Sequence, residues 1–200
     1  MEYITSSDFH FKDTAVALGK FEGIHRGHQL LMDEVKKQEL HGLRSVVFTF
    51  DRPTRLTLTG DTEYKQIYTK KERREILEKR GIDILIEHPF TKEFAALTPD
   101  RFIREVLVEK VGAKVIVVGT DFHFGKNRSG SIADLEKLEE ECGYHLIVVE
   151  KLQLNGKDIS STRIRASLEK GAMEEAKATL IDEVVVTGTG VQKKIAVTGA

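Results

Sequence analysis

The chain has 200 residues, of which 40% are hydrophobic and 32% charged, enough for one α/β domain with a buried core and too few for a second full domain. Its 31 Lys and Arg residues nearly balance 32 Asp and Glu residues, so the net charge of −1 gives no general attraction to nucleic acid or anionic membranes. The segment Met1–Asp13 lacks an apolar leader core, no run has the length of a membrane span, and Cys142 is the single cysteine. We therefore expect a cytoplasmic protein that binds small molecules, and the sequence does not determine its oligomeric state.

Short apolar, β-rich runs alternate with segments of helical periodicity along the chain. Strands are predicted at Thr14–Leu18, Arg44–Phe50, Asp83–Glu87, Lys114–Gly119 and His145–Glu150. Helices are predicted at Gln29–Glu39, Lys71–Lys79, Pro99–Val111 and Ile132–Glu141, ending at Gly42, Gly81, Gly112 and Gly143. This alternation predicts an α/β fold with a five-stranded parallel sheet and helices on both faces. The first strand is not followed by Gly-x-Gly-x-x-Gly, so the dinucleotide-binding fingerprint is absent.

The tetrapeptide His-Arg-Gly-His at 25–28 lies between the first strand and the first helix. Gly19 and Gly23 allow the backbone before it to approach a ligand closely, and a helix start favours an anion through its free N–H groups and its dipole. His25 and His28 add two donors at a spacing of three, which suits a phosphoryl group. A metal site is the alternative, but one cysteine and no nearby third ligand at zinc-like spacing make it a poor fit.

Further polar and aromatic groups follow the other predicted strands, and in a doubly wound sheet such strand ends gather at one ligand-binding edge. These segments are 51–55, 88–91 and 120–125 with Arg128. Residues 159–165, Ile-Ser-Ser-Thr-Arg-Ile-Arg, open another helix after the fifth strand. Ser160 or Ser161 is the expected N-cap, but three hydroxyls and two arginines exceed what a cap requires and suit triphosphate oxygens.

Together these blocks resemble the FMN adenylyltransferase module of bacterial FAD synthetases, a Rossmann-like nucleotidyltransferase fold, over roughly residues 14 to 180. The matching blocks are Gly19-x-Phe21-x-Gly23-x-His25-x-Gly27-His28, Thr49-Phe50-Asp51, Pro89-Phe90-Thr91, Val118-Gly119-x-Asp121-Phe122-x-Phe124-Gly125 with Arg128, and Ile159-Ser160-Ser161-Thr162-x-Ile164-Arg165. The resemblance implies that FMN and ATP are the substrates and FAD and pyrophosphate the products. It also implies Mg²⁺ that is held mainly by the ATP phosphates rather than by a dedicated protein metal site.

The resemblance assigns catalysis to His28, His25 and Arg165. His28 would stabilise the α-phosphoryl transition state and Arg165 the leaving pyrophosphate, while the FMN phosphate is itself the nucleophile. The implied ATP-binding residues are Gly19, Phe21, Gly23, His25, His28, Asp121, Ser161, Thr162 and Arg165. The implied flavin-binding residues are Phe50, Asp51, Pro89, Phe90, Phe122, Phe124 and Arg128.

Departures from the family pattern affect these expectations. Lys20 and Glu22 stand where the family has Asn and Asp, and residues 52–54, Arg-Pro-Thr, interrupt the usual Phe-Asp-Pro-His-Pro loop, which predicts a looser flavin pocket or a different preferred flavin form. We expect residues 1–181 to form the adenylyltransferase domain and residues 182–200 a short tail, a candidate remnant of the riboflavin kinase domain of the family. On this expectation the chain acts as a monofunctional enzyme.

Two alternatives stay open at this point. One is a nucleotidyltransferase of the same fold that accepts another phosphate ester, because the His pair and the Ser161 block do not specify the acceptor. The other is a non-catalytic protein that binds a flavin or a nucleotide, because the altered loop after Asp51 departs from the family.

Overall fold

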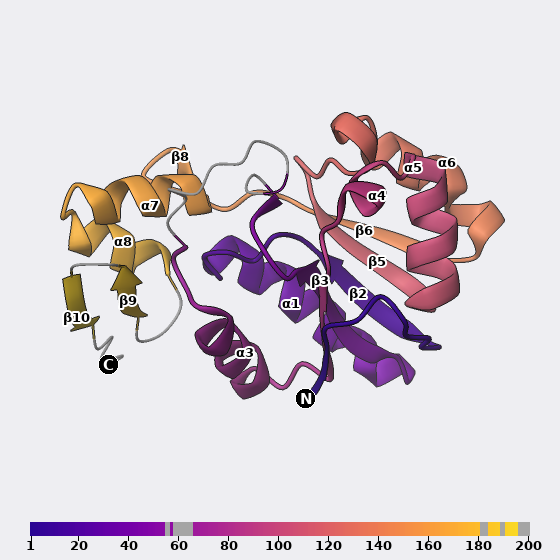
Figure 1. Cartoon of the computed structure of the whole chain (residues 1–200), viewed down its shortest axis with the longest axis horizontal. Coiled ribbons are helices and arrows are strands. Elements are labelled where there is room, and N and C mark those ends of the chain that lie inside the picture. Colours follow the sequence, from indigo (N-terminus) through magenta and orange to yellow (C-terminus); the bar gives the residue numbers. More distant parts are fainter. Residues whose placement is uncertain (55–56, 58–65, 181–183, 189–190, 196–200) are drawn as a thin grey trace.

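A six-stranded parallel sheet forms the centre of the molecule (Figure 1). The computed structural model describes residues 1–54, 57, 66–180, 184–188 and 191–195. The strand order in the sheet is β1-β4-β3-β2-β5-β6, and every neighbouring pair runs parallel. The strands are β1 Glu2–Ile4, β2 Thr14–Leu18, β3 Arg44–Phe50, β4 Ile84–His88, β5 Ala113–Gly119 and β6 His145–Val149. All five predicted strands are confirmed to within a residue at each end, and β1 is an additional strand.

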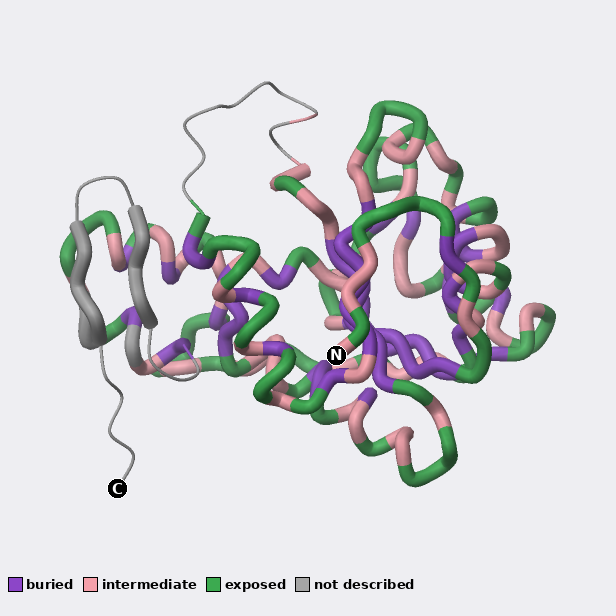
Figure 2. Tube along the Cα trace, turned by 60° about the horizontal axis from the view of Figure 1, so that its bottom comes forward, coloured by how far each residue is buried: buried purple, intermediate pink, exposed green. Residues whose placement is uncertain are grey.

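Helices cover both faces of this sheet, as the alternation of elements predicts. Val16 and Leu18 of β2 pack in one core with the helices η2 (Phe102–Lys110) and α6 (Ile132–Cys142), whereas Ala15 and Ala17 pack in the other with α1 (Arg26–Lys37) and α3 (Lys70–Lys79). Successive side chains of a strand point to opposite faces, so an uninterrupted apolar strand supplies both cores. Figure 2 accordingly shows the central strands as buried along nearly their whole length.

The predicted helices are present, with Gly42, Gly81, Gly112 and Gly143 each in a left-handed conformation just after a helix. At Gly112 a side chain is also excluded by space, because a Cβ there would lie 2.2 Å from the Phe11 carbonyl oxygen. The helices are α1 Arg26–Lys37, η1 Gln38–His41, α3 Lys70–Lys79, α4 Lys92–Ala95, α5 Pro99–Arg101, η2 Phe102–Lys110, η3 Lys126–Arg128, α6 Ile132–Cys142, α7 Ser161–Glu169 and α8 Met173–Thr179.

The segment predicted as a helix over Pro99–Val111 is helical but mostly not α-helical. After α5, η2 is a π-helix, in which the Val111 amide donates to the Val106 carbonyl oxygen at 2.9 Å, five residues back. The buried residues Phe102 and Val106, and Ile103 and Leu107, are four apart, a spacing that brings side chains near one another on either type of helix. Periodicity therefore identified the helix but not its hydrogen-bond pattern.

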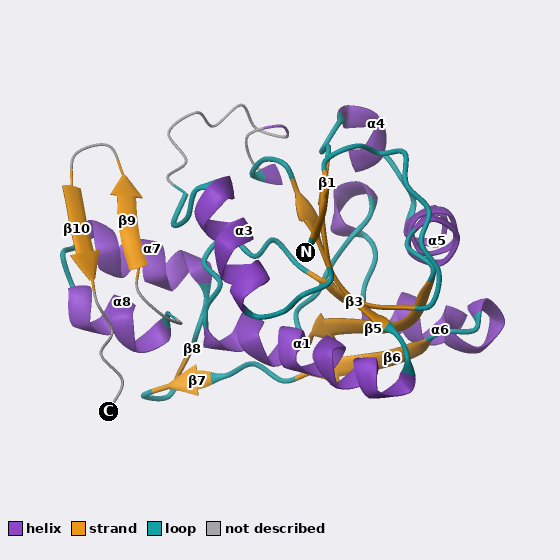
Figure 3. Ribbon diagram, turned by 90° about the horizontal axis from the view of Figure 1, so that it is seen from below, coloured by secondary structure: helices purple, strands orange, loops and turns teal. Residues whose placement is uncertain are grey.

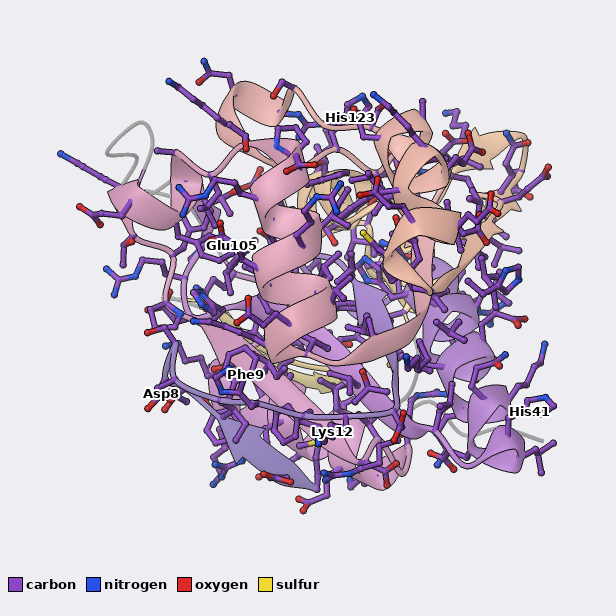
Figure 4. All side chains as sticks on the ribbon, turned by 90° about the vertical axis from the view of Figure 1, so that its right-hand side faces the viewer. Asp8, Phe9, Lys12, His41, Glu105 and His123 are labelled. Atoms are coloured by element: carbon purple, nitrogen blue, oxygen red, sulfur yellow. The ribbon has the colours of Figure 1, made fainter. Side chains whose placement is uncertain are left out.

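The N-terminal segment is part of the fold rather than a polar extension of it. Figure 4 shows Asp8, Phe9 and Lys12 on a strap that crosses the molecule beside the end of η2. The Phe11 amide donates to the Lys110 carbonyl oxygen at 2.8 Å, and the Phe9 side chain is only 7% exposed. Before the strap, β1 pairs with β4 at the edge of the sheet. Three residues are too short for a periodic pattern, which is why the sequence did not predict this strand.

Two small antiparallel pairs lie outside the central sheet, and Figure 3 shows both beyond its strands. Strands β7 Gln153–Leu154 and β8 Lys157–Asp158 are joined by Asn155 and Gly156, both with positive φ, the type of two-residue turn that Asn-Gly favours. The second pair, β9 Val184–Gly188 and β10 Val191–Ile195, falls in the segment predicted as a tail. None of the helices in the described part of the chain combines the length and hydrophobicity needed to cross a bilayer.

Candidate active site

The strands β2 and β5 are parallel neighbours in the centre of the sheet, and the direction in which successive strands are added to the sheet reverses between them. From β2 the chain builds β3 and β4 on one side, and later β5 and β6 on the other. Ligands of open α/β sheets bind outside the carboxyl ends of the strands at such a reversal. The loop that follows β2 and the loop that follows β5 are therefore the first places to look for a site.

His25 ends the β2 loop and is the N-cap of α1, where its Nδ1 accepts a hydrogen bond from the His28 amide at 3.3 Å. This role requires an unprotonated Nδ1, so the ring proton is on Nε2. The side chain is only 7% exposed, and burial lowers the pKa of His25 to about 4. His25 is therefore a neutral imidazole with one N–H donor at neutral pH.

The His28 imidazole lies between two other rings. It stacks on His25 with the ring centroids 3.7 Å apart, and its centroid is 4.9 Å from that of Phe21. Burial lowers the pKa of His28 well below its usual value, so this ring is neutral as well. Its Nδ1 atom is buried without a hydrogen-bond partner in the described part of the chain, an arrangement that costs free energy in the absence of a ligand.

Phe21 supports this arrangement from an unusual backbone conformation. Its φ is +44°, in the left-handed region, and its side chain is fully buried. A Cβ on Gly19 would come within 3.1 Å of the Phe21 ring, so the small residue at 19 makes room for it. Backbone strain of this kind costs about 1–3 kcal/mol and persists where the surroundings enforce it. Phe21 is thus placed to hold His28 rather than to expose its own ring.

The helix α7 brings the second predicted phosphate block to the β2 loop. Arg165 forms an ion pair with Glu22, its Nη2 lying 3.2 Å from Oε2, and both side chains are mostly buried. Gly23 lies against Ser161, because a Cβ on Gly23 would come within 3.0 Å of the Ser161 hydroxyl. Two segments more than 130 residues apart in sequence thus share one end of the sheet, as the clustering of strand ends predicted.

Within residues 159–165, one hydroxyl caps the helix and the others do not. Ser160 is the N-cap of α7 and accepts from the Arg163 amide at 3.3 Å, so the cap does not use the hydroxyls of Ser161 and Thr162. Arg163 points to the next helix, where its Nη2 lies 2.6 Å from the Glu175 carboxylate. Of the two arginines, Arg165 alone bonds to the β2 loop in the hydrogen bonds of the described residues.

Asp121 follows β5 and lies on the same edge as the histidines. Its carboxylate favours the charged form of His25, although burial of the ring outweighs this effect on the pKa. The carboxylate is exposed and pairs with Lys151 at 3.1 Å. The structure therefore brings Asp121 to the end of the sheet where His25, His28 and Arg165 lie, the predicted phosphate end, as the reading of the strand ends predicted.

A hollow of about 360 Å³, open solvent included, lies at the carboxyl end of β3. Its lining includes Lys20 and Glu22 from the β2 loop, Phe50 and Asp51 from the end of β3, and Tyr68 and Arg73 from the start of the α3 region. The Thr49 hydroxyl joins the two sides by donating to the Lys20 carbonyl oxygen at 2.8 Å. Because Glu22 also pairs with Arg165, the hollow borders the phosphate end directly.

The loop after Asp51 departs from the family pattern, yet Asp51 itself is firmly held. Its Oδ1 accepts from the Phe90 amide at 3.0 Å, and its Oδ2 lies 2.9 Å from the Arg52 guanidinium. Burial raises the pKa of Asp51, but these hydrogen bonds outweigh burial and keep the pKa below its usual value. Residues 55–56 and 58–65 of the loop lie outside the described part of the chain.

The predicted flavin-binding aromatics divide into two groups. Phe50 and Phe90 are in edge contact, with their centroids 4.7 Å apart, at the ends of β3 and β4. Phe122 and Phe124 stack on each other at 5.5 Å after β5, but Phe124 is 7% exposed and belongs to the core. Arg128 is exposed in η3 beyond this second group. Phe50, Phe90, Asp51 and Pro89 thus lie together at the carboxyl ends of β3 and β4, whereas Phe122, Phe124 and Arg128 follow β5; Phe50, Phe122 and Phe124 nevertheless pack in the same core cluster.

A buried polar network beneath the hollow was not predicted from the sequence. Arg73 on α3 bonds to the fully buried Glu87 of β4, with Nε 2.9 Å from Oε1, and Tyr3 of β1 donates to Oε2 at 2.6 Å. Burial, followed by the bond to Glu87, raises the pKa of Tyr3 to about 12. A Glu in a strand that begins Ile-Leu-Ile is the sequence signal that could have indicated a buried partner of this kind.

Comparison with known proteins decides the family. The family model of FAD synthetase matches residues 8–163. The chain belongs to the FAD synthetase family. A bifunctional riboflavin kinase/FMN adenylyltransferase of Listeria monocytogenes is 30% identical over 188 residues, which cover 93% of this chain and 59% of the relative. A relative from Geobacillus thermodenitrificans, whose name also pairs these two activities, is 32% identical over 84% of this chain and 89% of its own length.

Solved structures share the fold of this chain. A crystal structure titled as a macrolide-efflux protein from Streptococcus pneumoniae superimposes with a TM-score of 0.75 at 29% identity, over 88% of this chain and 61% of that one. A pantoate-beta-alanine ligase from Francisella tularensis shares the fold alone, with a TM-score of 0.53 at 15% identity, over 88% of this chain and 77% of that one. This chain spans about 60% of the length of the Buchnera aphidicola and Listeria relatives, 61% and 59% respectively.

Proposed function

We propose that this chain transfers the adenylyl group of ATP to the phosphate of FMN, giving FAD and pyrophosphate. The observation that carries the proposal is the contact between the two phosphate blocks, made by the Arg165–Glu22 ion pair beside His25 and His28. Membership of the FAD synthetase family and the names of the relatives supply the substrates. ATP would lie along the β2 loop and the start of α7, with Gly19, Gly23, Asp121, Ser161 and Thr162 as its other contacts, while the buried Phe21 ring supports His28 from behind.

The chemistry needs no nucleophile from the protein. An oxygen of the FMN phosphate forms the new bond to the α-phosphorus of ATP as the bond to the pyrophosphate oxygen breaks. The neutral rings of His25 and His28 would donate hydrogen bonds to the α-phosphoryl oxygens, and the bound anion would favour their protonation. Arg165 would stabilise the negative charge that develops on the leaving pyrophosphate.

The residues present fit a magnesium ion carried by the nucleotide. Asp121 is an exposed carboxylate at the phosphate end, and Mg²⁺ commonly uses one or two protein carboxylates together with phosphate oxygens. No group of three or more His, Cys, Asp or Glu side chains among the described residues is arranged to hold a metal ion. When bound, the ion would neutralise phosphate charge, with Asp121 as its candidate protein ligand.

The flavin ring is proposed to occupy the hollow at the end of β3. Phe50 and Asp51 line this hollow, and the Asp51 carboxylate accepts from the Phe90 amide, so Pro89 and Phe90 lie next to it. Phe122, Phe124 and Arg128 are secondary candidates, because they lie after β5. Phe50 and Tyr68 give the hollow aromatic surface for a flat ring, and charged side chains make up much of the rest of its lining.

The direct test supplies the purified chain with ATP, Mg²⁺ and FMN and measures FAD and pyrophosphate, in air and with reduced flavin. We expect FAD in at least one condition, and no FAD in both would contradict the proposal. Pantetheine phosphate, nicotinamide mononucleotide and phosphocholine serve as competing acceptors, since a same-fold transferase would prefer one of them. Tight FMN binding without pyrophosphate release would instead indicate a flavin-binding protein without catalytic activity.

A further inference from the structure

Arg73 borders the hollow and is held in place by the protein itself. It lies on α3 with 9% of its surface exposed, and its Nε donates to Glu87 Oε1 at 2.9 Å. Its Nη2 donates to the same carboxylate oxygen and, at 3.3 Å, to the Phe50 carbonyl oxygen at the end of β3. These bonds fix the plane of the guanidinium at the floor of the hollow, so its orientation does not depend on a ligand.

The charge of Arg73 is already neutralised. Glu87 is fully buried, and its other oxygen accepts from the Tyr3 hydroxyl, so the carboxylate stays close to the guanidinium and away from water. A neutralised pair attracts a phosphate weakly, yet it keeps directional N–H donors. Among the hydrogen bonds of the described residues, Arg73 uses Nε and Nη2 and leaves the two N–H groups of Nη1 without a partner.

We propose that Arg73 binds a carbonyl oxygen of the acceptor's ring through Nη1 and so orients that ring in the hollow. The inference rests on the proposed function, in which the acceptor is FMN, whose pyrimidine ring carries two carbonyl groups. A neutral carbonyl oxygen suits a donor whose charge is cancelled, whereas the anionic phosphates suit the two helix starts and the His pair at the other end of the site. Phe50 and Tyr68 line the same hollow and offer aromatic surface to a flat ring.

The first test leaves the protein unchanged and alters the acceptor. In 2-thio-FMN and 4-thio-FMN one carbonyl oxygen is replaced by sulfur, a weaker hydrogen-bond acceptor. We expect the KM of the wild-type chain for one of the two analogues to exceed that for FMN by roughly tenfold to a hundredfold, because a hydrogen bond to a charged group is weakened. Equal KM values for FMN and both analogues would overturn the inference without affecting the proposed function.

The second test uses Arg73→Lys, which keeps a cation for Glu87 but removes the planar donor edge. The KM for FMN should rise roughly tenfold to a hundredfold, the KM for ATP should stay the same, and the preference for FMN over the thio analogue should disappear. The matched control is Arg74→Lys on the same helix, because Arg74 is exposed and packs over the Tyr3 ring at 5.1 Å. This control should behave as wild type with all three acceptors.

Other results are equally decisive. An unchanged KM for FMN in Arg73→Lys overturns the inference, and a selective rise in the KM for ATP would instead place adenine in the hollow. Parallel losses for both substrates with a lower Tm would show a purely structural role. If the wild-type chain makes no FAD, the proposed function fails first, and quenching of FMN fluorescence by wild type, Arg73→Lys and Arg74→Lys then tests Arg73 on its own.

Discussion

The proposed phosphate end, with His25, His28 and Arg165, and the proposed acceptor end, the hollow at the end of β3, supply hydrogen-bond donors in different ways. At the phosphate end the two imidazoles are neutral because burial lowers their pKa values, and they stand beside the Arg165–Glu22 ion pair. At the acceptor end the cations are present from the start but are already paired, Arg73 with Glu87 and Arg52 with Asp51. The difference indicates that the choice of ligand at each end of the site depends more on where the hydrogen-bond donors point than on net charge, which is −1 for the whole chain.

The largest expected effect comes from the phosphate end. His28→Ala removes a donor aimed at the transition state, and such a loss typically lowers kcat by roughly 10²–10³, about 3 kcal/mol. FAD formation under saturating ATP and FMN measures it. His41→Ala is the matched control, since His41, labelled in Figure 4, is exposed at the end of η1 and precedes β3, whereas the proposed site lies at the carboxyl ends of the strands. Turnover in His28→Ala equal to that of this control would remove His28 from the mechanism.

The neutral state of the histidines predicts a stability that declines in acid. The pKa of His25 is about 4 in the folded chain against a usual value of 6.5, so between these two pH values the unfolded chain binds a proton that the folded chain does not. The contribution of His25 to the free energy of unfolding therefore has its full value above pH 6.5. It falls by about 3 kcal/mol as the pH drops to 4, and His28 adds a further loss.

Urea unfolding at pH 7.5, 6 and 5 measures this decline. His25→Asn keeps a side-chain acceptor for the α1 N-cap but does not titrate, so its unfolding free energy should depend less steeply on pH. An identical slope in the variant and the wild type would show that His25 does not cause the decline.

The two arginines of α7 separate ligand binding from folding. Arg165→Met should lower kcat/KM for ATP by roughly tenfold to a hundredfold, because a charge-assisted contact with the phosphates is lost. Arg163→Met should lower the Tm while leaving kcat/KM unchanged, because Arg163 bonds to Glu175 of α8. Similar kinetic losses in both variants would mean that α7 matters only as a packed element.

The smallest effect is expected at the rim of the acceptor end. Arg52 is 54% exposed and pairs with Asp51 at the surface, so Arg52→Ala should leave the Tm unchanged. Asp51 keeps its bond from the Phe90 amide in this variant, so the KM for FMN should change little. A large rise in that KM would show that Arg52 itself contacts the flavin and that the altered loop has a direct binding role.

Much of the fold was predictable because the sheet is parallel and buried. Strands such as β2 carry continuous apolar runs, here Ala15 to Leu18, and each helix between the predicted strands ends at a glycine with positive φ. The short edge strand β1 and the strap through Phe9 were not predictable, because each depends on a few residues that pair with distant parts of the chain. The β7–β8 hairpin did have a local signal, the Asn155-Gly156 turn.

By itself the sequence determined the alternation of strands and helices and the family blocks, because periodicity, capping and short motifs are local. It also indicated which strand ends carry phosphate-binding groups. Only the tertiary structure decided that Arg165 pairs with Glu22, that the histidines are neutral, and that Glu87 cancels the charge of Arg73. Ion pairing and desolvation depend on which distant side chains share a buried space, and that is a property of the folded chain.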